Sequence, residues 1–220
     1  MKIKFIAVAV TLFFLLPGSS CFGETADKYF PLKEGMAWVY GVLSNKPGTQ
    51  KITITNLAPR EVKGKSVTPR KWEVGGGVKY NFVAQDDFGV YQYAEQTGEN
   101  GEPKLISPKL YDLRNPVDRG TTWDLVIKTG EEDLKVNATI ESISETVQVP
   151  AGTYKDCVKV KQEGGGLVKK GGDTKLSITA YEWFAPGVGT VKSMFTFKRN
   201  APGKPESTET TTYQLESFKP

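Results

Sequence analysis

The acidic side chains that stand next to one another are the first residues whose chemistry could be catalytic. Asp86-Asp87 and Glu131-Glu132-Asp133 are the only dense acidic groups in the sequence. Paired carboxylates can cleave a glycosidic bond or bind calcium. Both groups stand where we expect turns, however, and neither has the spacing of a calcium loop. A carboxylate-dependent hydrolase that uses Asp86 and Asp87 is therefore the weakest of our three hypotheses.

Other catalytic patterns are missing from the sequence. There is no His, so the commonest general base and the commonest transition-metal ligand are both absent. Gly64-Lys65-Ser66 resembles the end of a phosphate-binding loop, but Pro59 stands where that loop needs Gly, and we expect a hairpin over 61–67. No Gly-x-Ser-x-Gly elbow is present. We predict a protein that is not an enzyme, with no catalytic residues, no metal and no cofactor.

The two cysteines have different expected roles. Cys157 has no His to activate its thiolate, and we interpret it as a small, half-buried strand residue. Cys21 follows Gly18-Ser19-Ser20, as the lipidated Cys follows the lipobox of bacterial lipoproteins, although Gly18 stands where that box usually has Leu. Cys21 is thus a candidate for lipidation. If Cys21 stays unmodified, a Cys21–Cys157 disulfide is an alternative.

The N-terminus has the three zones of an export signal. Lys2 and Lys4 precede an apolar run over 5–16, and small residues follow from Pro17. That run makes about 18 Å of helix, too short for a hydrocarbon core of about 30 Å. Cleavage after Gly23 competes with processing at Cys21. We predict a signal peptide over 1–23, one domain over 24–220, and a location in the periplasm or anchored to the outer membrane of a Gram-negative envelope.

Short alternating runs separated by turn residues dominate the chain after residue 35. Lys51-Ile52-Thr53-Ile54-Thr55 alternates polar and β-branched apolar side chains, as a strand with one buried face does. We predict similar strands over 78–85, 90–95, 134–140, 176–184 and 191–198, with loops at 75–77, 86–87, 98–101, 164–166 and 200–203. At most a short helix is expected near 108–116. The predicted fold is all-β, a curved antiparallel sheet or a partly open β-barrel.

Two segments with similar residue spacing suggest that the chain has two related halves. Pro31-Leu32-Lys33-Glu34-Gly35-Met36-Ala37-Trp38 shares its Pro, Gly and Trp spacing with Pro116-Val117-Asp118-Arg119-Gly120-Thr121-Thr122-Trp123. A weaker similarity pairs 80–84 with 181–185. We predict an internal repeat of 30–114 and 115–218.

Four motifs in order carry a resemblance to a family of uncharacterised exported bacterial proteins, many of them lipoproteins. They are the segments Phe30 to Trp38, Val149 to Cys157, Ala185 to Lys192 and Tyr213 to Phe218. The resemblance implies an envelope-located β domain similar to open half-barrel carriers of the lipoprotein-carrier type. It implies no catalytic residues.

Aromatic residues that share a strand face motivate the leading functional hypothesis. Concave β surfaces lined by such rings bind small molecules or peptides, although single rings more often fill a core. We therefore expect a non-enzymatic envelope protein that binds a lipid, another apolar small molecule or a partner protein in its curved sheet. The alternative is a structural or interaction lipoprotein that reaches the membrane only through a lipid anchor at Cys21. The charge of +4 is dispersed along the chain, so no nucleic acid partner is expected. The candidate lining residues are Trp38, Tyr40, Tyr80, Phe82, Tyr181 and Trp183.

Overall fold

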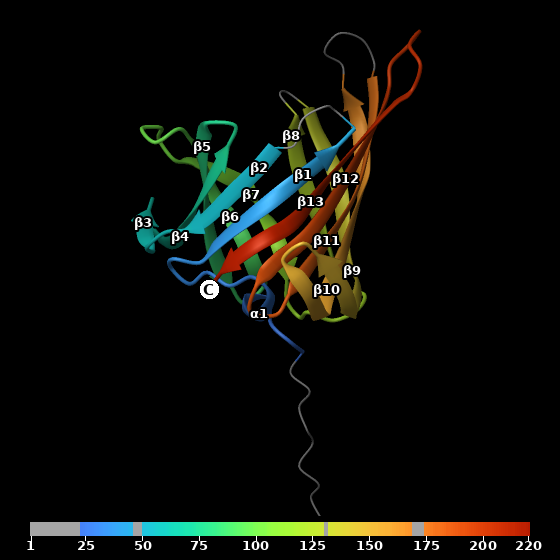
Figure 1. The fold of residues 1–220 in the computed structure, drawn as a ribbon. Helices are drawn as coiled ribbons and strands as arrows, with labels where there is room; N and C mark the ends of the chain where they lie inside the picture. The colour runs from blue at the N-terminus through green and yellow to red at the C-terminus, as the bar shows by residue number, and fades with distance from the viewer. Residues whose placement is uncertain (1–22, 46–49, 130–131, 169–173) are drawn as a thin grey trace, which may run out of the picture.

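The computed structural model of the chain describes residues 23–45, 50–129, 132–168 and 174–220. Within these ranges it has one short helix and thirteen strands (Figure 1). The predicted all-β class is confirmed. The bounds are α1 Ala26–Tyr29, β1 Ala37–Ser44, β2 Gln50–Asn56, β3 Arg60–Val62, β4 Lys65–Val74, β5 Gly77–Asp86, β6 Gly89–Thr97, β7 Lys104–Arg114, β8 Thr122–Thr129, β9 Glu132–Val149, β10 Gly152–Val168, β11 Thr174–Ala185, β12 Gly189–Asn200 and β13 Ser207–Lys219.

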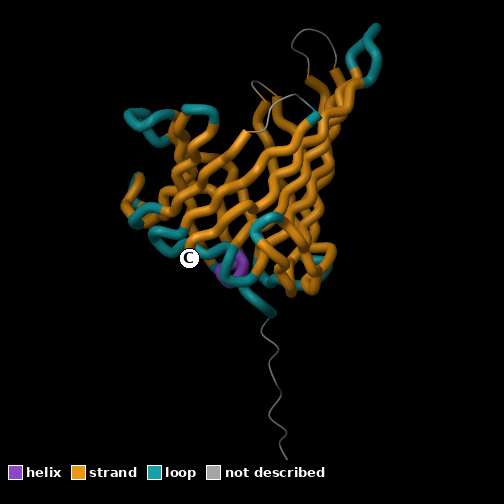
Figure 2. The backbone as a smooth tube through the Cα atoms, in the orientation of Figure 1, coloured by secondary structure: helices purple, strands orange, loops and turns teal. Residues whose placement is uncertain are grey.

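All strands but β3 follow one another in a single antiparallel sheet. Their order is β7-β6-β5-β4-β2-β1-β13-β12-β11-β10-β9-β8, and β3 pairs with β4 alone. The sheet curls until its edge strands β7 and β8 approach each other, as Figures 1 and 2 show. No backbone ladder joins these two strands over their described residues. The sheet is therefore a nearly closed barrel with one seam, as the sequence predicted.

Alternating side chains explain why these segments form strands. In β2, Ile52 and Ile54 are buried, whereas Thr53 and Thr55 between them are partly exposed. This two-residue period puts one face of the strand inside the barrel and the other outside. Each of the six predicted strand segments lies within a strand of the structure.

The helix α1 closes one end of the barrel. The Ala26 backbone nitrogen donates a hydrogen bond of 2.8 Å to Asn115 Oδ1, and the Gly187 nitrogen donates one of 2.7 Å to the Lys28 carbonyl. These bonds fasten α1 to the loop before β8 and to the β11–β12 turn. Tyr29 and Phe30 are buried there in the main core cluster. In Figure 2 the helix lies at the end of the barrel opposite the long hairpins.

The sheet consists of two meanders of six sequential strands each. The first contains β1, β2, β4, β5, β6 and β7, and the second runs from β8 to β13. The pairing of β1 with β13 joins them. The predicted boundary between 114 and 115 falls directly after β7. The shared ancestry of the halves stays a prediction.

The glycine triplet at 164–166 is not the loop that we predicted. It lies within β10, paired with both β9 and β11. A Cβ added at Gly164 would come within 2.1 Å of the Lys135 carbonyl oxygen, and one at Gly165 within 2.2 Å of that of Leu176. The close approach of the neighbouring backbones therefore requires glycine here, and the residues mark a tight place in the sheet rather than a turn.

The short helix expected near 108–116 was also placed wrongly. Most of that segment belongs to β7, and the helical turn is at 26–29. The prediction placed no strand here because Pro108 is a proline, and proline interrupts the interior of a sheet. Strand β7 is an edge strand, where the missing N–H of proline removes no ladder bond.

Candidate functional site

The barrel encloses a cavity of about 900 Å³. Near α1 its wall is formed by the buried side chains of Phe30 and Phe184, whereas at the other end Gly77 is exposed and Val74 and Val78 are partly exposed. The cavity therefore opens at the end of the barrel away from α1. This volume is within the range of ordinary small-molecule sites.

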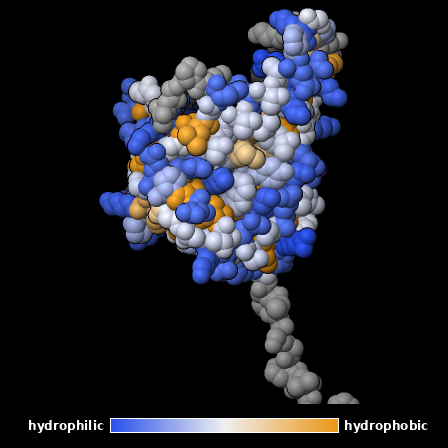
Figure 3. Space-filling model, turned by 45° about the vertical axis from the view of Figure 1, so that its right-hand side comes forward, coloured by the Kyte–Doolittle hydropathy of each residue, from blue (hydrophilic) through white to orange (hydrophobic). Residues whose placement is uncertain are grey.

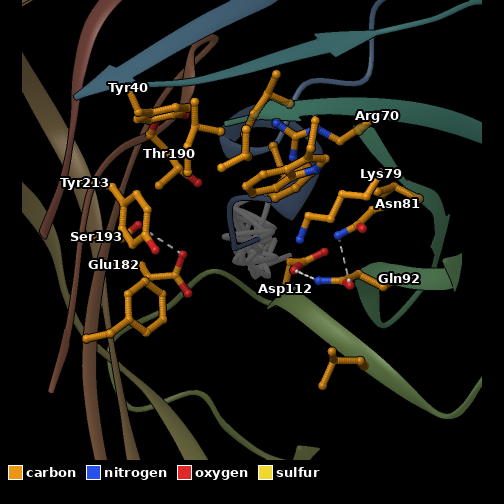
Figure 4. A pocket seen from close by; sticks show the side chains of 18 of the residues that line it. Tyr40, Arg70, Lys79, Asn81, Gln92, Asp112, Glu182, Thr190, Ser193 and Tyr213 are labelled. Atoms are coloured by element: carbon orange, nitrogen blue, oxygen red, sulfur yellow. Dashed lines mark hydrogen bonds between the residues drawn. The ribbon is translucent and has the colours of Figure 1, made fainter. Parts of the chain in front are cut away.

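Apolar residues supply much of the cavity wall, and polar residues from seven strands converge on it (Figure 4). Aliphatic side chains come from β2, β5, β7, β8 and the end of β4. The aliphatic lining residues are Ile52, Ile54, Val74, Val78, Val83, Leu110, Leu125 and Ile127. The polar lining residues other than tyrosines are Arg70, Lys79, Asn81, Gln92, Asp112, Gln162, Glu182, Thr190 and Ser193.

Strands β4 and β5 carry the cationic part of the wall. Arg70 is 8% exposed, and its guanidinium lies 4.6 Å from the ring centroid of Phe30 and 4.9 Å from that of Trp38. Lys79 pairs across the ladder with Trp72, and its Nζ lies 4.5 Å from the Trp72 ring centroid. Burial lowers the pKa of Arg70, and partial desolvation lowers that of Lys79, which is exposed near the mouth of the cavity.

Two carboxyl groups face the cavity from the other strands. Asp112 on β7 accepts a hydrogen bond of 2.8 Å from Gln92 Nε2, and Gln92 in turn accepts one of 3.2 Å from Asn81. Burial raises the pKa of Asp112 to about 6, against the lowering effects of the Gln92 hydrogen bond and of Arg70. The part of Asp112 that is accessible faces the cavity, so the carboxyl group is largely removed from bulk water.

Glu182 on β11 is the second of these carboxyl groups. Its Oε1 accepts a hydrogen bond of 2.8 Å from Gln162 Nε2, and its Oε2 accepts one of 3.4 Å from Ser193 Oγ. Burial and, to a smaller extent, the charge of Asp112 raise the pKa of Glu182 to about 7, against the lowering effects of the Ser193 and Gln162 hydrogen bonds. Glu182 is therefore partly protonated near neutral pH.

Three buried polar atoms at the cavity have no hydrogen-bond partner in the described part of the chain. They are Arg70 Nε, Trp72 Nε1 and Asp112 Oδ2. Buried polar groups are nearly always paired, because an unmet donor or acceptor costs about 1–3 kcal/mol. All three belong to residues that line one cavity, so the lining has hydrogen-bonding capacity that the described part of the chain does not meet.

The candidate lining aromatics do not gather at this cavity. Only Tyr40 lines it, and its hydroxyl donates a hydrogen bond of 2.6 Å to the Thr190 carbonyl. Trp38 is buried beneath Arg70 and donates from Nε1 to the Val188 carbonyl at 2.7 Å. The rings that do line the cavity are Phe30, Tyr40, Trp72, Tyr111, Phe184, Phe195 and Tyr213.

The other four candidates lie on strand faces that do not line the cavity. In β5 the cavity is lined by Lys79, Asn81 and Val83, so Tyr80 and Phe82 between them have the opposite side. Phe82 packs in a cluster with the β3–β4 hairpin, beneath Arg60. Tyr181 and Trp183 alternate in the same way with the lining residues Glu182 and Phe184. Their rings lie instead near the amines of Lys159 and Lys192.

Sequence reasoning missed the charged lining residues. A usable signal existed, because Arg70 and Glu182 each stand in the middle of an alternating strand segment. A charge at the centre of such a segment faces either solvent or a polar interior. We expected aromatic residues of β5 and β11 to line the interior, whereas the residues that line it there include Lys79, Asn81 and Glu182.

Asp86 and Asp87, the residues considered for hydrolysis, are not part of the cavity wall. Asp86 forms an ion pair of 2.7 Å with Lys109 and accepts a hydrogen bond from Tyr111. Part of the segment 131–133 lies outside the described residues. Over the described ranges, no group of three or more Cys, Asp or Glu residues is placed to hold a metal ion.

The structure places Cys157 inside the protein. Cys157 is fully buried rather than half-buried, and it is a free thiol. Burial raises its pKa to about 11. Cys21 and most of the signal segment lie outside the described residues.

No helix in the described ranges is long and apolar enough to cross a membrane. On the face drawn in Figure 3, apolar residues form small separate groups among hydrophilic ones.

The fold and the cavity together define a nearly closed antiparallel β-barrel with a polar site inside an apolar lumen. Residues 131–201, which include strands β9 to β12, match a family model described as DUF3108-like. No curated protein matches the chain.

Two solved structures resemble the whole domain. An inferred exported protein of Bacteroides fragilis with a YmcC-like fold has 18% sequence identity and a TM-score of 0.44, over 91% of this chain and 100% of that one. An inferred lipoprotein of Parabacteroides distasonis has 15% identity and a TM-score of 0.41, over the same shares of the two chains.

Proposed function

We propose that this protein is a non-enzymatic binding protein of the bacterial envelope that holds an amphipathic small molecule inside its barrel. One observation carries the proposal: the cavity of about 900 Å³ combines aliphatic walls with three buried polar atoms that have no partner among the described residues. A core serving stability alone would be filled, because cavities cost stability. An apolar body with a polar group matches this lining.

Filling the cavity tests the proposal. Ile127 lines the lumen from β8, and Ile127→Trp would place a large ring there. The control is Ile143→Trp, because Ile143 is 40% exposed on β9 and does not line the cavity. Binding of the neutral fluorescent probe N-phenyl-1-naphthylamine to the processed chain is expected to weaken by about 10-fold or more in Ile127→Trp, since about 1.4 kcal/mol of lost contact suffices.

The outcomes of this experiment are distinct. Ile143→Trp is expected to bind the probe as the unchanged protein does. If the unchanged protein binds no probe, or if Ile127→Trp binds it equally well, the lumen is not a binding site and the proposal fails. Lipid that co-purifies with the unchanged protein, and not with Ile127→Trp, would support it directly.

Export and anchoring form a separate part of the proposal. Support comes from the signal-like segment over 1–23 and from Cys21, which follows small residues. We propose that Cys21 is lipidated and holds the barrel to a membrane. Cys21→Ser should then move the protein from the membrane fraction to the soluble fraction and abolish incorporation of radioactive palmitate. An unchanged distribution would contradict the anchor without affecting the lumen proposal.

Hydrolysis is a second candidate function because Asp112 and Glu182 face one cavity. Paired carboxyl groups with separated pKa values can act as acid and base. Against this, Gln92 and Gln162 already donate to these carboxyl groups, which is the arrangement of a structural polar network. Turnover of glycoside or ester substrates by the unchanged protein that is lost in Glu182→Gln would favour the hydrolase.

A further inference from the structure

The donors at the cavity are less well satisfied than the acceptors. On the acidic side, amides or a hydroxyl already bond three of the four carboxyl oxygens of Asp112 and Glu182. On the cationic side, Arg70 Nε and Trp72 Nε1 have no partner. No carboxylate in the described part of the chain forms an ion pair with Arg70 or Lys79. The unmet need of the lumen is therefore mainly for acceptors.

Arg70 is held in place without an ion pair in the described part of the chain. Burial lowers its pKa, although the charge of Asp112 acts to raise it against that effect. The faces of Phe30 and Trp38 stabilise its charge and fix the plane of the guanidinium. Ring faces do not satisfy the N–H donors at its edge. A buried guanidinium without a carboxylate is costly unless an anion completes it, and its planar fork matches a carboxylate or a phosphate.

Trp72 and Lys79 extend this donor surface toward the mouth of the cavity. Arg70 and Trp72 are alternate residues of β4, so they share the inner face, and Lys79 is the cross-strand neighbour of Trp72. Figure 4 shows Arg70, Lys79 and also Asp112 on the same side of the cavity, with Glu182 on the other. The donor surface comprises Arg70, Trp72 and Lys79.

We propose that the lumen selects amphipathic oxyanions, whose carboxylate or phosphate group binds Arg70, Trp72 and Lys79 while the apolar remainder packs against Ile52, Ile54 and Ile127. This inference rests on the proposed function and names the chemical class of its ligand. A cationic amphiphile fits less well, because most of the carboxyl oxygens that would receive it already have donors.

A competition series with one constant alkyl chain tests the headgroup. Dodecanoate, dodecyl phosphate, dodecanol and dodecyltrimethylammonium are each used to displace N-phenyl-1-naphthylamine from the processed chain, below their micelle concentrations. The anions are expected to compete at concentrations about 10-fold or more below that of the alcohol, since a charge-assisted hydrogen bond contributes about 1.5–3 kcal/mol. Whichever of dodecanoate and dodecyl phosphate competes better identifies the headgroup.

Substitutions test which residues cause the preference for anions. Arg70→Met is expected to remove most of the preference for anions and to leave competition by dodecanol unchanged. Lys79→Met should reduce the preference partly, and it gives a second test if Arg70→Met does not fold. Lys192→Met is the control, because Lys192 lies over the Trp183 ring and does not line the cavity.

The failures of the two proposals are distinguishable. Equal competition by the alcohol and the anions, or better competition by the cation, would overturn the inference while the lumen remained a binding site. A preference for anions that persists in both Arg70→Met and Lys79→Met would also overturn it. Absence of any probe binding would overturn the proposed function itself.

Discussion

The indole nitrogen of Trp123 donates a hydrogen bond of 3.1 Å to the carbonyl oxygen of Tyr111. Trp123 belongs to β8 and Tyr111 to β7, so this bond crosses the seam at which the barrel lacks a ladder. Trp123 is also buried in the core cluster next to α1. One side chain thus substitutes for part of the backbone pairing that would have closed the sheet.

Trp123→Phe is expected to destabilise the barrel more than Trp72→Phe does. Both changes remove the same atoms, but Trp123 Nε1 has a partner and Trp72 Nε1 has none. The difference in free energy of unfolding should be about 1 kcal/mol or more, because a hydrogen bond is lost only at Trp123. Urea denaturation followed by circular dichroism measures it, and equal losses would show that the seam bond contributes nothing.

Stability is expected to fall as pH rises toward neutrality. The folded-state pKa values of Asp112, about 6, and Glu182, about 7, lie above the value of about 4 expected in the unfolded chain. Between these limits the folded state binds more protons than the unfolded state, so the free energy of unfolding decreases with increasing pH. The stabilisation that Asp112 and Glu182 contribute to the folded state is fully present below about pH 4 and is lost above about pH 7.5.

Glu182→Gln should make the stability less dependent on pH between about 4.5 and 7.5, by about 1 kcal/mol or more over that interval. Glu102→Gln is the control, because Glu102 is exposed in the β6–β7 loop. Thermal denaturation at several pH values gives the slope. A slope that Glu182→Gln does not change would mean that other groups set the pH dependence.

Gly35 and Gly120 occupy equivalent places in the two meanders, and substitutions at both should cost similar free energies. Their φ angles are +82° and +92°, and each backbone nitrogen donates to a carbonyl of the second strand after it, Asn56 in β2 and Ile140 in β9 respectively. An added Cβ would meet no atom within 4 Å at either position, so the cost comes from backbone strain alone.

We expect Gly35→Ala and Gly120→Ala each to lower the free energy of unfolding by about 1–2 kcal/mol. Gly77→Ala is the matched control, because Gly77 has no positive φ and its added Cβ would have only an ordinary contact of 3.4 Å. Chemical denaturation of the three variants checks this. Costs that differ widely between positions 35 and 120 would argue against equivalent turns, and hence against the predicted repeat.

Cys157 should not react in the folded protein. Its thiol is fully buried, and burial raises its pKa to about 11, so thiolate is scarce and inaccessible. Under native conditions, labelling by a thiol reagent should therefore be limited by the rate at which the folded protein opens to expose Cys157. In denaturant, labelling should be fast. Rapid native labelling would contradict the packing of the cluster that holds it.

The same titration reports on Cys21, since the sequence contains two cysteines. One reactive thiol per unfolded chain means that Cys21 was removed or modified, as cleavage or lipidation requires. Two thiols would show that it is retained and free. A reactive thiol that is seen only after reduction would instead support the Cys21–Cys157 disulfide.

Local patterning was sufficient to predict the strands. Whether a segment such as 50–56 becomes a strand depends on the two-residue alternation of its own side chains, which the sequence displays directly. Turns at Pro150 and at Pro186-Gly187 were predictable for the same reason, because their backbone requirements are met by the residues in the turn itself. The all-β class and the partly open barrel follow from these local features.

The inside of the barrel was decided only by the tertiary structure. Alternation shows that a strand has two faces, but which face turns inward depends on the strands beside it and on the curl of the whole sheet. On β5 and β11, Lys79, Asn81 and Glu182 face the lumen, while the rings of Tyr80, Phe82, Tyr181 and Trp183 lie on the opposite side. Arg70, Asp112 and Glu182 are far apart in sequence and meet because sheet closure brings β4, β7 and β11 around one cavity. Local side-chain chemistry therefore determined what each segment is, and long-range strand pairing determined which residues form the site.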